Sequence, residues 1–239
     1  MTEILKRMRE RQSSRYPFDV EKRISRQKLE QILEAARWAP TAHNMQNFYI
    51  IVVDDRKLLK TIASIKSPVS EAFVRENYQQ LSFSGEELIK KKVGIMGDVF
   101  PPAMRSPNIK LDDAAHEAFA AGQIRLIQAS PTLLVVIYDP EKRAPASEGD
   151  FLGHLSLGCM IENMWLTAQS LGIDFHIVSE IAVPSIEKEV KSLLVIPQNL
   201  RIALSIRLGY VASRPRYLRV RRDIEDFIYH NRFDHKGLE

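Results

Sequence analysis

The amino-acid sequence predicts one domain of the α+β or α/β class. Apolar stretches of strand length alternate with stretches of helical periodicity along most of the chain. No internal repeat occurs, and no linker divides the sequence into two hydrophobic segments. The chain has 239 residues, 45% of them hydrophobic, and is long enough to bury a substantial core. We therefore expect residues 1–239 to form a single domain.

The N-terminal quarter predicts three helices and one strand. Apolar residues recur every three or four positions in the helical stretches, and serine or aspartate precedes two of them as an N-cap. The predicted elements are a helix over residues 2–11, a helix between Ser25 and Trp38, a strand over residues 48–53 and a helix over residues 56–65, which Asp54 or Asp55 can cap.

Residues 66–110 have no sustained pattern. Short helical pieces are interrupted by prolines and glycines, and a run of three lysines starts at Lys90. Because long irregular segments inside compact domains often cover binding sites, we expect a lid-like excursion here.

Regular periodicity returns after residue 111. The predicted elements are a helix over residues 112–129, a strand over 132–138, a helix over 151–171, a strand over 174–178, a helix over 184–194, a strand over 201–208 and a short helix over 223–229. The helix over 151–171 is apolar on nearly every side, which predicts a position in the core or at a subunit interface. Gly172 is its expected C-cap. Cys159 lies within it, and we expect a small buried side chain.

Composition excludes several classes of protein. A single cysteine excludes an internal disulfide and is typical of the reducing cytoplasm. The longest apolar runs, such as 133–137, are too short to span a membrane, and residues 1–7 read as an amphipathic helix rather than a signal peptide. There is no Cys/His cluster, so no metal site is expected.

The formal net charge is +4, and arginines gather near both ends of the chain. These arginines could converge on one phosphate, because guanidinium groups match phosphate oxygens. A nucleic-acid surface and plain solvated charge are the alternatives. Nucleic acid is the weaker one, since no zinc-finger spacing or RNA-binding signature occurs.

No motif for side-chain catalysis is present. The sequence lacks the glycine-rich phosphate loops, the Gly-x-Ser-x-Gly elbow and any paired carboxylates in an apolar setting. A protein with polar binding groups but no reactive side chains suggests that a cofactor carries the chemistry.

Two short segments are candidates for ligand binding. Residues 39–48 crowd hydroxyl and amide groups between a helix and a strand, and Pro40 ends the helix. A ligand-gripping loop and a polar surface turn are equally good interpretations of this stretch alone. Residues 11–16 bracket hydroxyl and amide groups with Arg11 and Arg15, which suits a phosphate on a polyol. The alternative is a basic helix end that offsets the helix dipole.

The order and spacing of these motifs resemble the flavin-dependent nitroreductase family over essentially the whole chain. Arg-x-Ser-x-Arg begins at Arg11, and Pro-Thr-x-x-Asn-x-Gln-Asn begins at Pro40. A strand then enters His176-Ile177-Val178-Ser179, and Gly209-Tyr210 opens an arginine-rich tail.

The resemblance implies an α+β, nitroreductase-like fold with a central, mainly antiparallel sheet flanked by helices. It implies an intertwined homodimer that binds FMN at the subunit interface. The expected activity is that of a cytoplasmic, NAD(P)H-dependent FMN oxidoreductase that reduces nitroaromatics, quinones or similar acceptors by a ping-pong mechanism. Flavin N5 carries the chemistry, so no catalytic side chain is expected.

The resemblance also implies the cofactor-binding residues, which fall into four segments. They are Arg11, Gln12, Ser13 and Arg15; Pro40, Thr41, Asn44 and Gln46 from the other subunit; Ile177, Val178 and Ser179 near N5; and Arg219 and Arg221 at the phosphate. Thr41 and Asn47 replace the family's Ser and Pro, and 177–179 lacks its glycine forms. His176, beside that segment, is the histidine to test.

Two alternatives stay open. The flavin could serve reductive dehalogenation or flavin destruction, since residues 66–110 show no deciding pattern. The protein could instead be a non-catalytic, basic nucleic-acid-binding protein. The sequence does not distinguish NADH from NADPH.

Overall fold

The computed structural model describes residues 1–66, 76, 79–80, 82–97, 124–145, 147, 149–213 and 218–238. Contacts divide the chain into two compact units. One consists of Met1–Ser67 and Ala120–Arg214, and the other of Pro68–Phe119 and Pro215–Glu239. The expectation of one domain over the whole chain stays a prediction.

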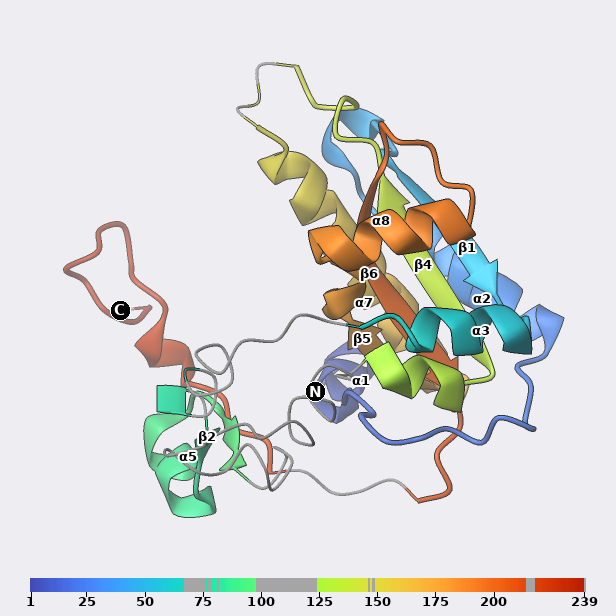
Figure 1. Ribbon diagram of the computed structural model, residues 1–239. Helices are drawn as coiled ribbons and strands as arrows, with labels where there is room; N and C mark the ends of the chain where they lie inside the picture. The colour runs from blue at the N-terminus through green and yellow to red at the C-terminus, as the bar shows by residue number, and fades with distance from the viewer. Residues whose placement is uncertain are drawn as a thin grey trace. The chain divides into compact units, whose positions relative to one another are not determined.

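The first unit is built on a four-stranded sheet in the order β1-β4-β6-β5 (Figure 1). The strands are β1 (Phe48–Val53), β4 (Thr132–Tyr138), β6 (Arg201–Gly209) and β5 (Asp174–Val178). Every neighbouring pair is antiparallel. This confirms the predicted α+β fold with an antiparallel sheet flanked by helices.

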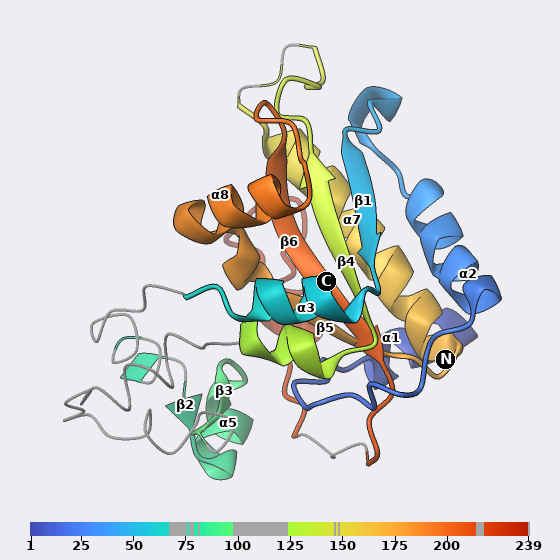
Figure 2. The same cartoon turned by 45° about the vertical axis from the view of Figure 1, so that its right-hand side comes forward.

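Helices cover both faces of this sheet (Figure 2). The covering elements are α2 (Arg26–Arg37) and α7 (Phe151–Ser170) on one face, and α3 (Arg56–Ala63), α8 (Pro184–Leu193) and the 3-10 helices η4 (Ile124–Ala129) and η5 (Ser179–Ala182) on the other. Strand β4 is buried along its whole length. Leu134 and Val136 pack toward α2 and α7, whereas Leu133 and Val135 pack toward α3 and α8. Burial on both faces explains its continuous apolar sequence.

Local capping chemistry sets several helix boundaries where the sequence predicts them. Ser25 Oγ accepts a hydrogen bond from Lys28 N at 3.4 Å, and Asp55 Oδ1 accepts one from Leu58 N at 2.8 Å. Gly172 follows α7 with a φ of 73°, the left-handed conformation that a glycine C-cap supplies.

The second unit contains a small βαβ arrangement. The parallel strands β2 (Ser82–Phe83) and β3 (Ile95–Met96) are joined by α5 (Gly85–Lys91). A capping box between Ser84 and Glu87 starts α5. The remaining predictions for residues 66–110 lie largely outside the described residues.

Two predicted helices differ from the structure. The predicted helix over 223–229 is only the 3-10 turn η6 (Ile224–Asp226), because Asp223 and Asp226 close a capping box on a single turn. Within the predicted helix over 112–129, the described part is the 3-10 helix η4, and residues 112–123 lie outside the described residues.

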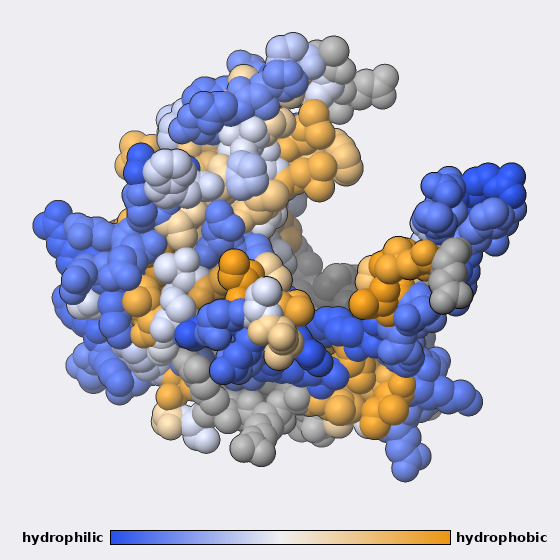
Figure 3. Space-filling view, turned by 180° about the vertical axis from the view of Figure 1, so that it is seen from behind, coloured by the Kyte–Doolittle hydropathy of each residue, from blue (hydrophilic) through white to orange (hydrophobic). Residues whose placement is uncertain are grey.

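The prediction of a buried Cys159 is wrong. Its side chain is exposed on α7, on the same helical face as Phe151 and Leu155, which are 67% and 52% exposed. Apolar surface is visible over the N-terminal part of α7 in Figure 3. Because α7 is apolar on nearly every side, its sequence does not reveal which face meets the sheet.

Candidate functional site

The segment that follows α1 (Glu3–Glu10) is fixed along the outer edge of β5. Ser14 N donates to Phe175 O at 3.0 Å, and Ser14 Oγ donates to Asp174 Oδ1 at 2.8 Å. The other carboxylate oxygen of Asp174 accepts a hydrogen bond from Val211 N. Ser14 is buried, whereas Ser13, the predicted ligand contact, is half-buried. Ser14 is thus a structural anchor that the sequence did not identify.

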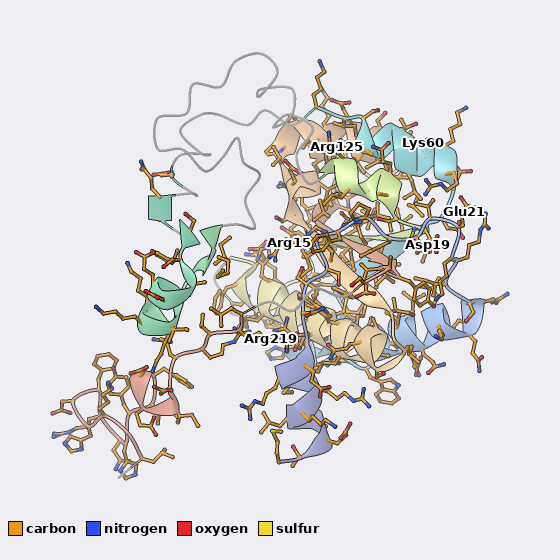
Figure 4. All side chains as sticks on the ribbon, turned by 90° about the horizontal axis from the view of Figure 1, so that it is seen from below. Arg15, Asp19, Glu21, Lys60, Arg125 and Arg219 are labelled. Atoms are coloured by element: carbon orange, nitrogen blue, oxygen red, sulfur yellow. The ribbon has the colours of Figure 1, made fainter. Side chains whose placement is uncertain are left out.

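The same segment is also held against α7. The guanidinium of Arg11 lies 4.4 Å from the ring centroid of Trp165, and its Nε lies 3.1 Å from Glu162 Oε1. Trp165 Nε1 donates to Gln12 O at 3.2 Å. These contacts orient the first predicted arginine and leave the second, Arg15, exposed (Figure 4).

The loop at residues 40–47 has a strained backbone. His43, Asn44 and Gln46 have φ values of 49°, 53° and 45°, in the left-handed region. This region costs a non-glycine residue about 1–2 kcal/mol, and asparagine tolerates it best. Three such residues in one short loop must be held by other contacts, and strain of this kind concentrates at functional sites.

Hydrogen bonds within the loop provide part of this support. Thr41 Oγ1 accepts from Gln46 N at 3.2 Å, and Gln46 Nε2 donates to Asn44 Oδ1 at 3.0 Å. Thr41 and Gln46 therefore shape the loop, while Pro40, Asn44 and Gln46 are exposed. Three of the four predicted loop residues thus reach the surface.

Contacts with α7 and β4 fix the loop in place. Ala42 N donates to Ser156 Oγ at 3.1 Å, and Asp139 N donates to Asn47 O at 2.9 Å. Asn47 is buried against Gly153, where an added Cβ would lie 2.8 Å from Asn47 Nδ2. A side chain at residue 153 would thus force the buried amide of Asn47 to shift.

The third predicted segment lies at the end of β5. Val178 is buried, Ile177 is half-buried and Ser179 is exposed. Because the carbonyl of Phe175 faces the outer edge of the sheet, alternation in the antiparallel ladder turns the backbone of Ile177 to the same edge. The backbone of Ile177 and the anchored segment at Ser14 thus share one edge.

A buried pair, His176 and Arg207, lies beneath this edge. They face each other across β5 and β6, and Arg207 Nη1 lies 2.9 Å from His176 Nδ1. Burial, with the charges of Arg207 and Arg15, lowers the pKa of His176 from 6.5 to about 3. His176 is therefore neutral at physiological pH, and its Nδ1 accepts the arginine hydrogen bond. Sequence reasoning missed Arg207, although one arginine in an otherwise apolar strand is a detectable signal.

The two tail arginines belong to the second unit. Arg219 and Arg221 are both exposed, and Arg221 Nη1 donates to Val220 O. Their assignment to a phosphate stays a prediction.

In the part of the chain that the structure describes, no three His, Cys, Asp or Glu side chains are grouped so that they could hold a metal ion. None of the described helices combines the length and the apolar character needed to span a membrane.

Comparison with known proteins agrees with the fold. Residues 8–210 match the Nitroreductase family. No curated protein matches the sequence. A putative NADH dehydrogenase/NAD(P)H nitroreductase from Bacteroides thetaiotaomicron is 16% identical, with a TM-score of 0.63 over 98% of this chain and 99% of that one.

Two further similar structures are of nitroreductases with FMN bound. A putative nitroreductase in complex with FMN from Desulfovibrio desulfuricans is 17% identical, with a TM-score of 0.63 over 98% of this chain and 99% of that one. A nitroreductase with bound FMN from Desulfitobacterium hafniense is 22% identical, with a TM-score of 0.58 over 96% and 98%. The match over residues 8–210 covers most of the sequence, and the chain belongs to the nitroreductase family.

Proposed function

We propose that this protein binds FMN and uses NAD(P)H to reduce electron-poor acceptors, such as nitroaromatics or quinones, with ping-pong kinetics. One observation carries the proposal: the exposed Arg15 follows a buried anchor, Ser14, on the β5 edge that also presents the backbone of Ile177. A cation and backbone hydrogen-bonding groups therefore share one edge.

The chemical character of these residues fits FMN. A phosphate and the electron-rich edge of a flavin both favour a guanidinium, and Arg15 is exposed beside Ser14. The backbone N–H and C=O of Ile177 offer a donor and an acceptor to a flat heteroatomic ring. The strained loop at 40–47 presents the amides of Asn44 and Gln46. Bound FMN would supply the electron transfer, and these residues would hold and orient it.

Assembly as a homodimer is part of the proposal. The described chain exposes Ile4, Leu5 and Met8 on α1, at 66%, 46% and 45%, and it exposes Phe151 and Leu155 on α7. Clustered apolar side chains of this size mark interaction surfaces. A second copy would cover them and would bring its own residues 40–47 to the site.

Proton supply in this proposal comes from solvent. His176 is buried and neutral, and its lowered pKa makes it unsuitable as a general acid at physiological pH. The expectation that no side chain acts as a catalyst stays a prediction.

The decisive experiment is an absorption spectrum of the purified protein, followed by anaerobic titration with NADH and with NADPH. We expect a flavin spectrum, release of FMN on denaturation and bleaching by at least one nicotinamide cofactor. Protein that is colourless and does not bind added FMN would contradict the proposal.

The titration with both cofactors also addresses the preference for NADH or NADPH, which the sequence does not determine. Bleaching by one of them at much lower concentration would establish the preferred reductant. Flavin that is bound but not bleached by either would retain the cofactor assignment and remove NAD(P)H as co-substrate.

A further inference from the structure

Arg207 is buried completely, yet its hydrogen-bond acceptors among the described residues are all neutral. Its Nε donates to Ser130 Oγ at 2.6 Å, and its Nη1 donates to His176 Nδ1 at 2.9 Å. Its Nη2 donates to Tyr16 O at 3.0 Å and to Ala129 O at 3.3 Å. Among the described residues, no carboxylate forms an ion pair with this guanidinium.

A buried charge without a counter-ion is costly, and an apolar residue of similar size would fill the same space. Burial lowers the pKa of Arg207 to about 9, so the group is still charged at neutral pH. These hydrogen bonds offset part of that cost, and each of them also fixes the group that accepts it.

One of these bonds fixes the residue next to Arg15. Tyr16 O is held by Arg207, and Ser14 is held by β5, so Arg15 lies between two anchored neighbours. The Phe18 ring lies 4.3 Å from the Arg207 guanidinium carbon, and Phe18 N donates to Ala129 O at 2.8 Å. Residues 14–18 are thus tied to β5, to Arg207 of β6 and to the last residue of η4.

A second bond fixes the ring of His176. Since a guanidinium can only donate, His176 Nδ1 must be the acceptor, and the ring proton lies on Nε2. The tautomer follows from the hydrogen-bond network. Arg207 therefore orients both the N-terminal segment and the ring beside Ile177.

We propose that Arg207 is a positioning residue for the FMN site, which holds Arg15 in its binding position through Tyr16 and keeps His176 in one neutral tautomer. The proposal rests on the proposed function, because it needs FMN to bind beside Arg15. It adds a residue that does not itself contact the cofactor.

The test compares the FMN dissociation constants of the wild type and of Arg207→Met and Arg207→Lys, by quenching of FMN fluorescence with FMN-stripped protein. Arg207→Met removes the charged hydrogen bond to Tyr16 O, and we expect FMN binding to weaken about 10-fold or more. Lysine keeps the charge but has no planar fork to reach Tyr16 O and His176 together, so partial rescue is expected.

Arg201→Met is the matched control. It removes an arginine from the same strand, but Arg201 is half-exposed and pairs with Glu187, and has no hydrogen bond to residues 14–18. Circular dichroism and thermal melting verify that each variant is folded. Binding of FMN by the control should stay close to that of the wild type.

A pH series supplies a readout that simple loss of stability would not produce. Arg207 on β6 and Arg15 on the N-terminal segment are the charged groups that act on His176. Without Arg207, the histidine should titrate at a higher pH, detectable by NMR of its ring protons. The FMN phosphate takes up a proton in this range with either protein, so the readout is the difference: FMN affinity of Arg207→Met should fall more steeply between pH 7 and pH 5 than that of the wild type.

The outcomes separate the two proposals. If the wild type does not bind FMN, both are overturned. If the wild type binds FMN and folded Arg207→Met binds it equally well at every pH, only the role of Arg207 is overturned. If Arg207→Met does not fold, Arg207→Lys decides, and an unchanged dissociation constant in that variant overturns the role.

Discussion

Phe18 packs directly against Gly209. A Cβ placed on Gly209 would lie 2.6 Å from Phe18 Cδ2 and 2.8 Å from Phe18 Cβ. Phe18 is buried, and its Cβ is bonded directly to the backbone, so these atoms cannot move away easily. The last residue of β6 must therefore lack a side chain for the N-terminal segment to dock.

This contact predicts that Gly209→Ala destabilises the protein. Overpacking of a filled site costs about 1–3 kcal/mol. Chemical denaturation would measure the free energy of unfolding. Gly158→Ala is the control, because a Cβ there meets nothing within 4 Å and alanine favours a helix. Equal stability of Gly209→Ala and wild type would contradict the packing described for Phe18.

The neighbouring serines provide a second prediction. Ser14→Ala removes the buried hydrogen bond to Asp174 and should cost about 1–3 kcal/mol of folding free energy. Ser13→Ala should change stability by no more than about 0.5 kcal/mol. If Ser13 contacts the cofactor, as the family resemblance implies, its variant should instead release FMN more readily. Thermal melting and FMN retention are measured on both; the same loss of stability in each would show that their roles are not separate.

These serines also show where sequence reasoning reaches its limit. The Arg-x-Ser-x-Arg motif located the segment, but which of two adjacent serines is buried depends on how the segment docks on β5. The caps Ser25, Asp55 and Gly172 were predictable because they act on backbone groups a few residues away.

Other features depend on the tertiary structure in the same way. Arg207 interrupts an apolar strand, and only the arrangement of β5, Ser130 and Tyr16 reveals what it binds. The left-handed backbone of His43 and Gln46 contradicts the ordinary preference of both residues. Contacts with Ser156 and Asp139 hold the loop, and both lie far away in the sequence.

The pKa of His176 gives a third prediction, on acid stability. Its pKa falls from 6.5 to about 3 on folding, so between these pH values the unfolded chain binds a proton that the folded chain does not. Stability therefore decreases as the pH falls through this window, by at most roughly 5 kcal/mol from this residue. His176→Gln keeps a neutral acceptor for Arg207 and should lose this part of the pH dependence.

The measurement is the free energy of unfolding at several values between pH 7 and pH 4, for wild type and variant. The difference between the two should change steadily in favour of His176→Gln as the pH falls. His230→Gln, at an exposed position, is the control for loss of a histidine side chain outside the core. A constant difference for His176→Gln would mean that His176 is not held neutral.

The fourth prediction concerns whether the loop at 40–47 contacts the FMN of its own subunit or that of a partner subunit. Arg15→Ala and Asn44→Ala should each weaken FMN binding if both residues contact the flavin. In a homodimer where the loop completes the partner's site, a mixed dimer of the two variants has one site with both substitutions and one intact site. About half of the sites in the purified mixed dimer would then bind FMN with wild-type affinity, against about a quarter in an unselected mixture formed by random pairing. If the loop serves its own subunit, every site in the mixture carries one substitution and none is restored.

Co-expression of the two variants with different affinity tags, followed by FMN titration of the doubly purified dimer, separates these outcomes. Restored binding would show that the strained loop is held in place for a neighbouring subunit; its absence would assign the loop to its own chain.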